Sequence, residues 1–175
     1  MAKWSIVAVL MCIGISSLSA QPASGRASDE SQLGFYLGRW TEDGQSRATP
    51  TGAFGKVTGD ESCSWFSGGP SMVCRETTKD QNSETDSLFI LAYDAARKVY
   101  TVYGTDSTGT IISGTGTVDK DVWRWTAEAR VKGTVTPMRY TFRPAGSGAR
   151  TMDVEVSAGK GTWAKTVSVT YKRAR

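Results

Sequence analysis

The segment from residue 122 to 131 constrains the fold of this chain most, because apolar and polar residues alternate along it without a break. Trp123, Trp125, Ala127 and Ala129 occupy one phase, and charged or hydroxyl residues occupy the other. Successive side chains of a β-strand point to opposite faces, so the pattern predicts a strand with one dry and one wet face. Three later segments alternate in the same way, and no helical stripe appears among them. The C-terminal half is therefore expected to be a meander of antiparallel strands around an aromatic interior.

Short polar or glycine-containing turns separate the expected strands, which favours antiparallel hairpins between sequence neighbours. About ten such strands would expose long edges in a flat sheet, so we expect closure into an up-and-down β-barrel. A β-sandwich is the alternative. Glycines at positions 104, 109, 114 and 116 fit the kinks at which a small barrel turns its corners. The expected strand ranges are 39–43, 53–60, 62–67, 71–78, 87–93, 98–104, 110–118, 121–131, 136–143, 150–157 and 161–172.

The N-terminus has the layout of a secretory signal peptide over residues 1–20, with a basic residue, an apolar run and small residues. The apolar run is too short for a membrane span, which takes about 20 residues. Cleavage is expected after Ala20, with a cut after Ser19 as the alternative. Residues 21–31 are expected to form a flexible leader, and residues 32–175 a single β-barrel domain. The mature protein is then periplasmic or secreted.

A short helix is expected before the first strand. Asp29 and Glu30 would lie in its first turn, Leu33 and Tyr36 would form its apolar side, and Gly38 would end it.

The charge pattern argues against nucleic acid as a partner. Loss of Lys3 with the signal peptide leaves 20 Lys and Arg against 17 Asp and Glu. The two signs are interleaved along the chain, so no basic stripe is available to follow a phosphate backbone. No pattern in the sequence indicates an oligomeric state.

Cys63 and Cys74 are the cysteines that remain after cleavage, and exported thiols tend to pair. The residues between them read as strand, turn and strand, with a widened turn at 67–70. This arrangement places the two cysteines opposite each other as a non-hydrogen-bonded pair, where side chains approach closely. We therefore expect a structural disulfide rather than a catalytic dithiol.

The sequence contains no histidine, which excludes Ser–His and Cys–His nucleophile pairs and histidine-based haem and zinc sites. No metal site, cofactor or catalytic residue is expected. The acid pairs Asp60/Glu61 and Asp119/Asp121 lie at the ends of expected strands and are interpreted as solvated turn residues.

The aromatic residues give a positive indication of function, because aromatic walls with polar tips are typical of small-molecule pockets. They also fill the cores of small β-proteins, so a filled interior remains the alternative. Lys165 falls in phase with the expected inward set of the last strand; a bulge or an extended side chain would instead place it in water. The candidate ligand-binding residues are Trp65, Tyr93, Tyr103, Trp123, Trp125, Tyr140, Trp163 and Lys165.

Several motifs together resemble one family. They are Leu37-Gly38-Arg39-Trp40, the segment from Cys63-Ser64-Trp65 through Gly68-Gly69 to Cys74-Arg75, and Tyr93-Asp94 followed by Tyr100, Tyr103, Asp106 and Gly109. The chain is similar to secreted bacterial proteins of the domain-of-unknown-function 1579 family, which are thought to form calycin or lipocalin-like barrels. The resemblance implies that Trp40 closes one end of the barrel beneath the N-terminal helix. Related barrels bind haem through a histidine near the C-terminus, and this chain has none.

These observations favour an exported, non-enzymatic barrel that holds a small, largely apolar molecule in its interior. The alternative is a structural or partner-binding envelope protein with a filled core. An enzyme that uses Lys165 or a carboxylate is a third hypothesis.

Overall fold

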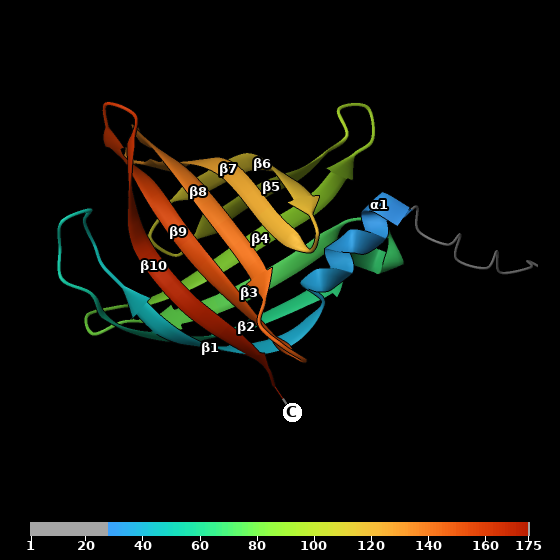
Figure 1. The fold of residues 1–175 in the computed structure, drawn as a ribbon, viewed down its shortest axis with the longest axis horizontal. Coiled ribbons are helices and arrows are strands. Elements are labelled where there is room, and N and C mark those ends of the chain that lie inside the picture. The colour runs from blue at the N-terminus through green and yellow to red at the C-terminus, as the bar shows by residue number, and fades with distance from the viewer. Residues whose placement is uncertain (1–27, 175) are drawn as a thin grey trace, which may run out of the picture.

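Ten antiparallel strands form a closed barrel in the computed structural model, which describes residues 28–174 (Figure 1). Each strand pairs with its sequence neighbours, and the first pairs with the last. The up-and-down β-barrel expected from the sequence is therefore confirmed. The elements are α1 (Ser28–Ser31), η1 (Gln32–Phe35), β1 (Gly38–Ser46), β2 (Gly55–Trp65), η2 (Phe66–Gly68), β3 (Met72–Lys79), β4 (Glu84–Asp94), β5 (Val99–Asp106), β6 (Ile111–Asp119), β7 (Val122–Val131), β8 (Thr134–Pro144), β9 (Ala149–Gly159) and β10 (Thr162–Arg173).

Pairing between β1 and β10 closes the barrel. The register runs from Trp40 opposite Arg173 to Ser46 opposite Val167, so the first strand is paired along most of its length on this side as well. Each strand therefore has one face toward the barrel interior and one toward the outside. Because side chains alternate between the two faces, every second residue points into the interior.

Strand β7 has the two faces that its alternation predicts. Trp123, Trp125, Ala127 and Ala129 are buried, and the residues between them are exposed. The two indole rings stack with their centroids 5.8 Å apart. Val131 also belongs to the inward phase but is 40% exposed, because it lies at the end of the strand.

The short N-terminal helices cover one end of the barrel (Figure 1). Leu33 and Tyr36 are buried there among the core aromatics. The Trp40 indole donates to the Tyr36 carbonyl at 2.9 Å, and the Trp125 indole donates to the Tyr36 hydroxyl at 2.8 Å. Tyr100 donates its hydroxyl proton to the Asp29 carbonyl at 2.7 Å. These hydrogen bonds hold the helical segment against the barrel. They also give partners to indole and hydroxyl groups that would otherwise be buried without one.

Part of the expected N-terminal organisation lies outside the described residues. The signal peptide over residues 1–20 and most of the leader belong to that part, whereas residues 28–31 of the expected leader form α1. Within residues 28–174, no helix is long and apolar enough to cross a membrane.

Strand β2 is continuous where two strands were expected. The predicted break near residue 61 does not occur, because Glu61 pairs with Trp40 of β1 on one side and with Glu76 of β3 on the other. The interpretation of Asp60 and Glu61 as solvated turn residues is therefore wrong for Glu61, which is buried inside the barrel. Backbone pairing on both sides overrides the local polarity of these two residues.

A bulge in β10 changes which side chains face inward. The register shifts between Lys165 and Val167, so Val167 and the later alternate residues Val169 and Tyr171 face the interior. Trp163 and Lys165, before the bulge, pair with Ser157 and Glu155 on the outer face. The expected inward position of Trp163 is wrong, and Lys165 has the alternative position that a bulge gives, because one extra residue reverses the phase of a strand.

Two of the glycines expected to kink the barrel make room for aromatic rings. A Cβ atom at Gly116 would lie 2.5 Å from the Trp125 indole, and one at Gly104 would lie 2.3 Å from the Phe89 ring. Both distances are far below van der Waals contact. The Trp125 and Phe89 rings can therefore be accommodated only because the neighbouring strand has glycine, which lacks a side chain, opposite each ring.

The expected disulfide between Cys63 and Cys74 joins β2 to β3. The two residues are direct register partners with Cα atoms 4.0 Å apart, and both are buried. The bridge closes the turn through η2 and lies in the main hydrophobic core.

We expect the Cys63→Ala/Cys74→Ala double variant to lose about 3 kcal/mol of unfolding free energy, because an open loop gives the unfolded chain more conformational entropy. Urea unfolding, with and without reductant, measures this loss. The double variant should be insensitive to reductant. Thiol titration of the wild-type protein first confirms that the reductant has opened the bridge. An unchanged urea midpoint in that reduced protein would contradict the prediction.

Candidate functional site

Four charged side chains lie on the inner wall of the barrel: Glu42 on β1, Glu61 on β2, Glu76 on β3 and Arg150 on β9. Each continues the inward phase of its strand. Glu42 follows Trp40 by two positions, Glu61 precedes Cys63 by two, Glu76 follows Cys74 by two, and Arg150 precedes Met152 by two. Because the sheet is closed, the inward-facing charged residues of these four strands lie in the same interior. We call these four residues the interior charge cluster.

Arg150 and Glu61 form a buried ion pair. The guanidinium Nη2 contacts the Glu61 carboxylate, and Nη1 donates to the Phe35 carbonyl at 3.2 Å. The guanidinium carbon lies 4.2 Å from the centre of the Trp40 ring. Arg150 is 1% exposed and Glu61 is 8% exposed. A guanidinium can fill such a site because it pairs with a carboxylate and stacks on aromatic rings together.

Glu42 and Glu76 form a second polar pair, next to the first. The two carboxyl groups are close enough that Glu76 raises the pKa of Glu42. The Tyr171 hydroxyl donates to Glu76 Oε1 at 2.8 Å. Gly59 leaves room for Glu42, since a Cβ atom there would lie 3.0 Å from Glu42 Oε2. That oxygen is buried and has no hydrogen-bond partner.

Burial changes the acidity of all three glutamates. It raises the pKa of Glu42 to about 9, with further increases from the neighbouring Glu76 and Glu61. It also raises the pKa of Glu61 to about 7, although the Arg150 guanidinium acts in the opposite direction. Burial raises the pKa of Glu76 as well, against the hydrogen bond from Tyr171. The interior charge cluster therefore retains at least one proton at neutral pH.

A cavity of about 100 Å³ lies beside the cluster, with Glu61 and Glu76 in its wall. Aliphatic residues and Cys74 complete part of the lining, and aromatic rings supply much of the rest. The aromatic lining residues are Tyr36, Phe89, Trp125, Tyr140, Phe142 and Tyr171. The space thus combines an apolar wall with carboxylate oxygens on one side.

The candidate ligand-binding residues from the sequence divide into three groups in the structure. Trp125 and Tyr140 line the cavity. Trp65, Tyr93 and Trp123 belong to or pack against the hydrophobic core that includes Leu33 and Tyr36 of the N-terminal helical segment. The remaining three, Tyr103, Trp163 and Lys165, lie on the outer face.

The outer-face residues have contacts of their own. Tyr103 is 56% exposed and pairs with Ile90 of β4. The Arg139 guanidinium carbon lies 3.7 Å from the centre of the Trp163 ring. Lys165 Nζ lies 2.9 Å from Asp153 Oδ1, and its side chain is 46% exposed. The sequence alternative of a bulge that places Lys165 in water describes its position in the structure.

Sequence analysis missed the interior charge cluster, although the signal was present. Glu42, Glu76 and Arg150 were not considered because charged residues are seldom buried, and Glu61 was assigned to a turn. Extending the inward alternation by one step from Trp40, Cys74 and Met152 reaches three of these positions.

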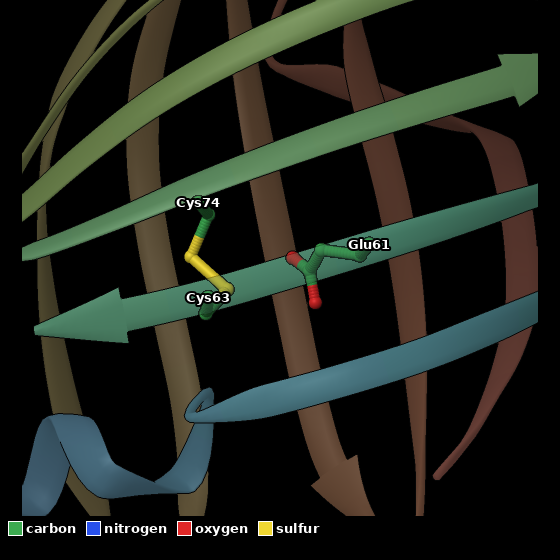
Figure 2. Close-up of side chains that lie close together, drawn as sticks. All are labelled: Glu61, Cys63 and Cys74. Atoms are coloured by element: carbon green, nitrogen blue, oxygen red, sulfur yellow. A yellow bond between two sulfur atoms is a disulfide. The ribbon is translucent and has the colours of Figure 1, made fainter. Parts of the chain in front are cut away.

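Glu61 lies beside the two cysteines, with ligand-type atoms of all three residues within 4.8 Å of one another. Figure 2 shows the Glu61 carboxylate next to the sulfur–sulfur bond between β2 and β3. The chemistry of this group does not fit a metal centre, because metal ions bind thiolates and both sulfurs here are bonded to each other.

Stability should fall as pH rises from about 5 to about 9, because the folded state holds carboxyl protons that the unfolded chain releases. The raised pKa of Glu42 makes it the main contributor in the upper part of this range. We therefore expect Glu42→Gln to flatten the dependence of Tm on pH between about 7 and 9. Glu128→Gln, on the exposed face of β7, is the matched control. An unchanged slope in Glu42→Gln would contradict the assignment.

Removal of Arg150 should leave Glu61 buried without its partner. We expect Arg150→Met to lose about 3–5 kcal/mol of unfolding free energy, and Glu61→Gln/Arg150→Met to recover part of it. Arg143→Met, which breaks the solvent-exposed pair with Asp153, should cost less than about 1 kcal/mol. Denaturant unfolding at pH 7 compares the variants, and equal losses for Arg150→Met and Arg143→Met would refute the structural role of Arg150.

Among the solved structures that share this fold are two with 14% sequence identity to this chain. The crystal structure of Rv2717c from M. tuberculosis has a TM-score of 0.63 and 14% sequence identity, covering 85% of this chain and 99% of that chain. The S-type phycobiliprotein lyase CPES from Guillardia theta has a TM-score of 0.53 and 14% identity, covering 86% of this chain and 95% of that chain. At this identity the likeness establishes the fold alone.

Comparison with curated protein sequences gives no significant match. The family described as "Protein of unknown function (DUF1579)" matches residues 28–173, which includes every strand of the barrel. The chain therefore belongs to the DUF1579 family.

Proposed function

We propose that this protein is an exported, non-enzymatic barrel that binds a compact small molecule with an apolar body in its interior cavity. The observation that carries the proposal is the cavity beside Glu76, with six aromatic residues in its lining. Ligand sites are concave, mostly apolar and supplied with a few polar groups that fix orientation. This cavity has all three features.

The size of the cavity limits the ligand. Drug-sized ligands occupy pockets of about 300–1,000 Å³, whereas a single water needs about 10–15 Å³. The observed volume of about 100 Å³ is between these values. The proposed ligand is accordingly a small molecule of roughly one ring, rather than a long fatty acid or a porphyrin.

The proposed route to the cavity is the end of the barrel away from α1. At the α1 end, Leu33 and Met72 are 0% exposed and Tyr36 is 3% exposed, so the path is filled by side chains. At the opposite end the inner wall of β6 and β7 includes the small residues Gly114, Ala127 and Ala129, together with Ile112.

Two observations support a non-enzymatic function: the lack of histidine in the sequence and the location of Lys165 on the outer face. The chain has no histidine to act as a general base. Lys165, the candidate nucleophile from the sequence, forms an ion pair with Asp153 on the outer face.

Export is supported by the Cys63–Cys74 disulfide, since such bridges persist in oxidising compartments. We propose cleavage of residues 1–20, which intact mass measurement of the protein recovered from the periplasm or medium tests. A mass equal to that of the uncleaved chain would contradict export by this route.

Intrinsic fluorescence tests ligand binding, because Trp125 lines the cavity. We expect toluene and benzyl alcohol to change the emission saturably and to raise Tm, as ligands that bind only the folded state do. Palmitate and protoporphyrin should produce neither effect. Trp125→Phe should lose most of the fluorescence response, while Trp163→Phe on the outer face should retain it. No saturable response to any of the small probes would indicate a filled core.

A second candidate function is partner binding through the outer face. Ile90 is 45% exposed and pairs with Tyr103, which is 56% exposed, so two large apolar side chains are adjacent on β4 and β5. Cross-linking in the periplasm tests this alternative. A stoichiometric protein adduct that is lost in Tyr103→Lys, but kept in Thr126→Lys on β7, would favour it over ligand binding.

A further inference from the structure

On the basis of the proposed function, we infer that the ligand carries a compact positive charge, a protonated primary amine, which the Glu76 carboxylate receives with Glu42 behind it. Its apolar body would then occupy the aromatic side of the cavity. The inference rests on the balance of charge inside the barrel, on an unsatisfied carboxylate oxygen and on the nature of the cavity wall.

The interior charge cluster has more acids than bases. Three carboxyl groups share the barrel interior with the single guanidinium of Arg150, and no other lysine or arginine between residues 28 and 174 is buried. Arg150 is committed to Glu61, to the Phe35 carbonyl and to the Trp40 ring. Among residues 28–174, Glu42 and Glu76 therefore have no buried lysine or arginine that is not already paired with another carboxylate.

The Glu42 carboxyl group is incompletely satisfied. Its residue is 5% exposed, and Oε2 has no hydrogen-bond partner. The neighbouring Glu76 raises the pKa of Glu42, and Glu76 lies in the cavity wall. A buried acceptor without a donor costs about 1–3 kcal/mol. An ammonium group at Glu76 would supply donors and charge at the one place where this pair meets the cavity.

The cavity wall next to Glu76 also suits a cation. Glu76 pairs with Ser87 of β4, and Cys74, two residues before Glu76, pairs with Phe89. Phe89 is therefore the next inward-facing residue of β4 beside Glu76. Phe89, Tyr140 and Trp125 all contribute to the lining. Aromatic faces attract ammonium groups, and the attraction is greater where water is excluded. A carboxylate beside aromatic rings therefore selects cations over neutral molecules of equal shape.

Three probes of similar size and different charge test the inference on the full mature protein: benzylammonium, benzyl alcohol and benzoate. Isothermal titration calorimetry at pH 7 measures each affinity. We expect benzylammonium to bind about 10-fold or more tightly than benzyl alcohol, as one charge-assisted hydrogen bond would produce, and benzoate to bind weakest. The comparison on the unmodified protein decides the charge preference without any variant.

Variants then assign the preference to residues. Glu76→Gln should abolish the preference for benzylammonium over benzyl alcohol, and a cooperative urea unfolding transition shows that the variant is folded. Glu128→Gln, an equivalent change on the outside of β7, should preserve the preference. A preference that survives in Glu76→Gln would overturn the role of Glu76.

The outcomes separate the two proposals. Equal binding of benzylammonium and benzyl alcohol, or tightest binding of benzoate, would overturn the charged ligand and leave small-molecule binding intact. Absence of binding by all three probes and by toluene would overturn both.

Discussion

Closure of the barrel between β1 and β10 is the constraint on which the rest of the structure depends. Once the backbone ladder is closed, strand phase alone assigns each residue to the inside or the outside. The indole rings of β7 enter the interior by this rule, and so do Glu42, Glu61, Glu76 and Arg150. Buried charges are costly, so the interior must compensate them. Three features do so: the Arg150–Glu61 pair, the raised pKa values of Glu42 and Glu76, and the hydrogen bond from the Tyr171 hydroxyl to Glu76.

The interior is consequently divided along the barrel axis. Near α1 it is a filled aromatic core, in which Tyr36 accepts hydrogen bonds from the indoles of Trp40 and Trp125. Beyond this core lie the acids and a cavity of about 100 Å³. Arg150 connects the two parts, since it binds Glu61 in the wall and the Phe35 carbonyl in the N-terminal helical segment. The same ion pair orders one end of the barrel and uses the only cation that is buried among residues 28–174, so the neighbouring Glu42 and Glu76 are left for a ligand.

The fold was largely predictable from the sequence, whereas the candidate site was predictable only in part. The unbroken alternation of β7, the short turns and the spacing of Cys63 and Cys74 specify antiparallel hairpins, a buried aromatic face and the bridge. Trp125 and Tyr140 were correctly placed on the inner wall for the same reason. Trp163 was misplaced because a one-residue bulge in β10 leaves no mark in the apolar pattern, whereas for Lys165 a bulge was one of the alternatives considered. Glu61 was misplaced because local polarity suggested a turn.

The sequence by itself determined which residues share a strand face, because the side-chain period of a strand is a local property of the backbone. It also determined the all-β class and the disulfide partners, since both follow from short-range spacing. Only the tertiary structure decided that Glu42, Glu61 and Glu76 of the first three strands meet Arg150 of β9 in one interior beside a cavity. Their meeting depends on closure and register, which are set by contacts over the whole barrel rather than by a few neighbouring residues.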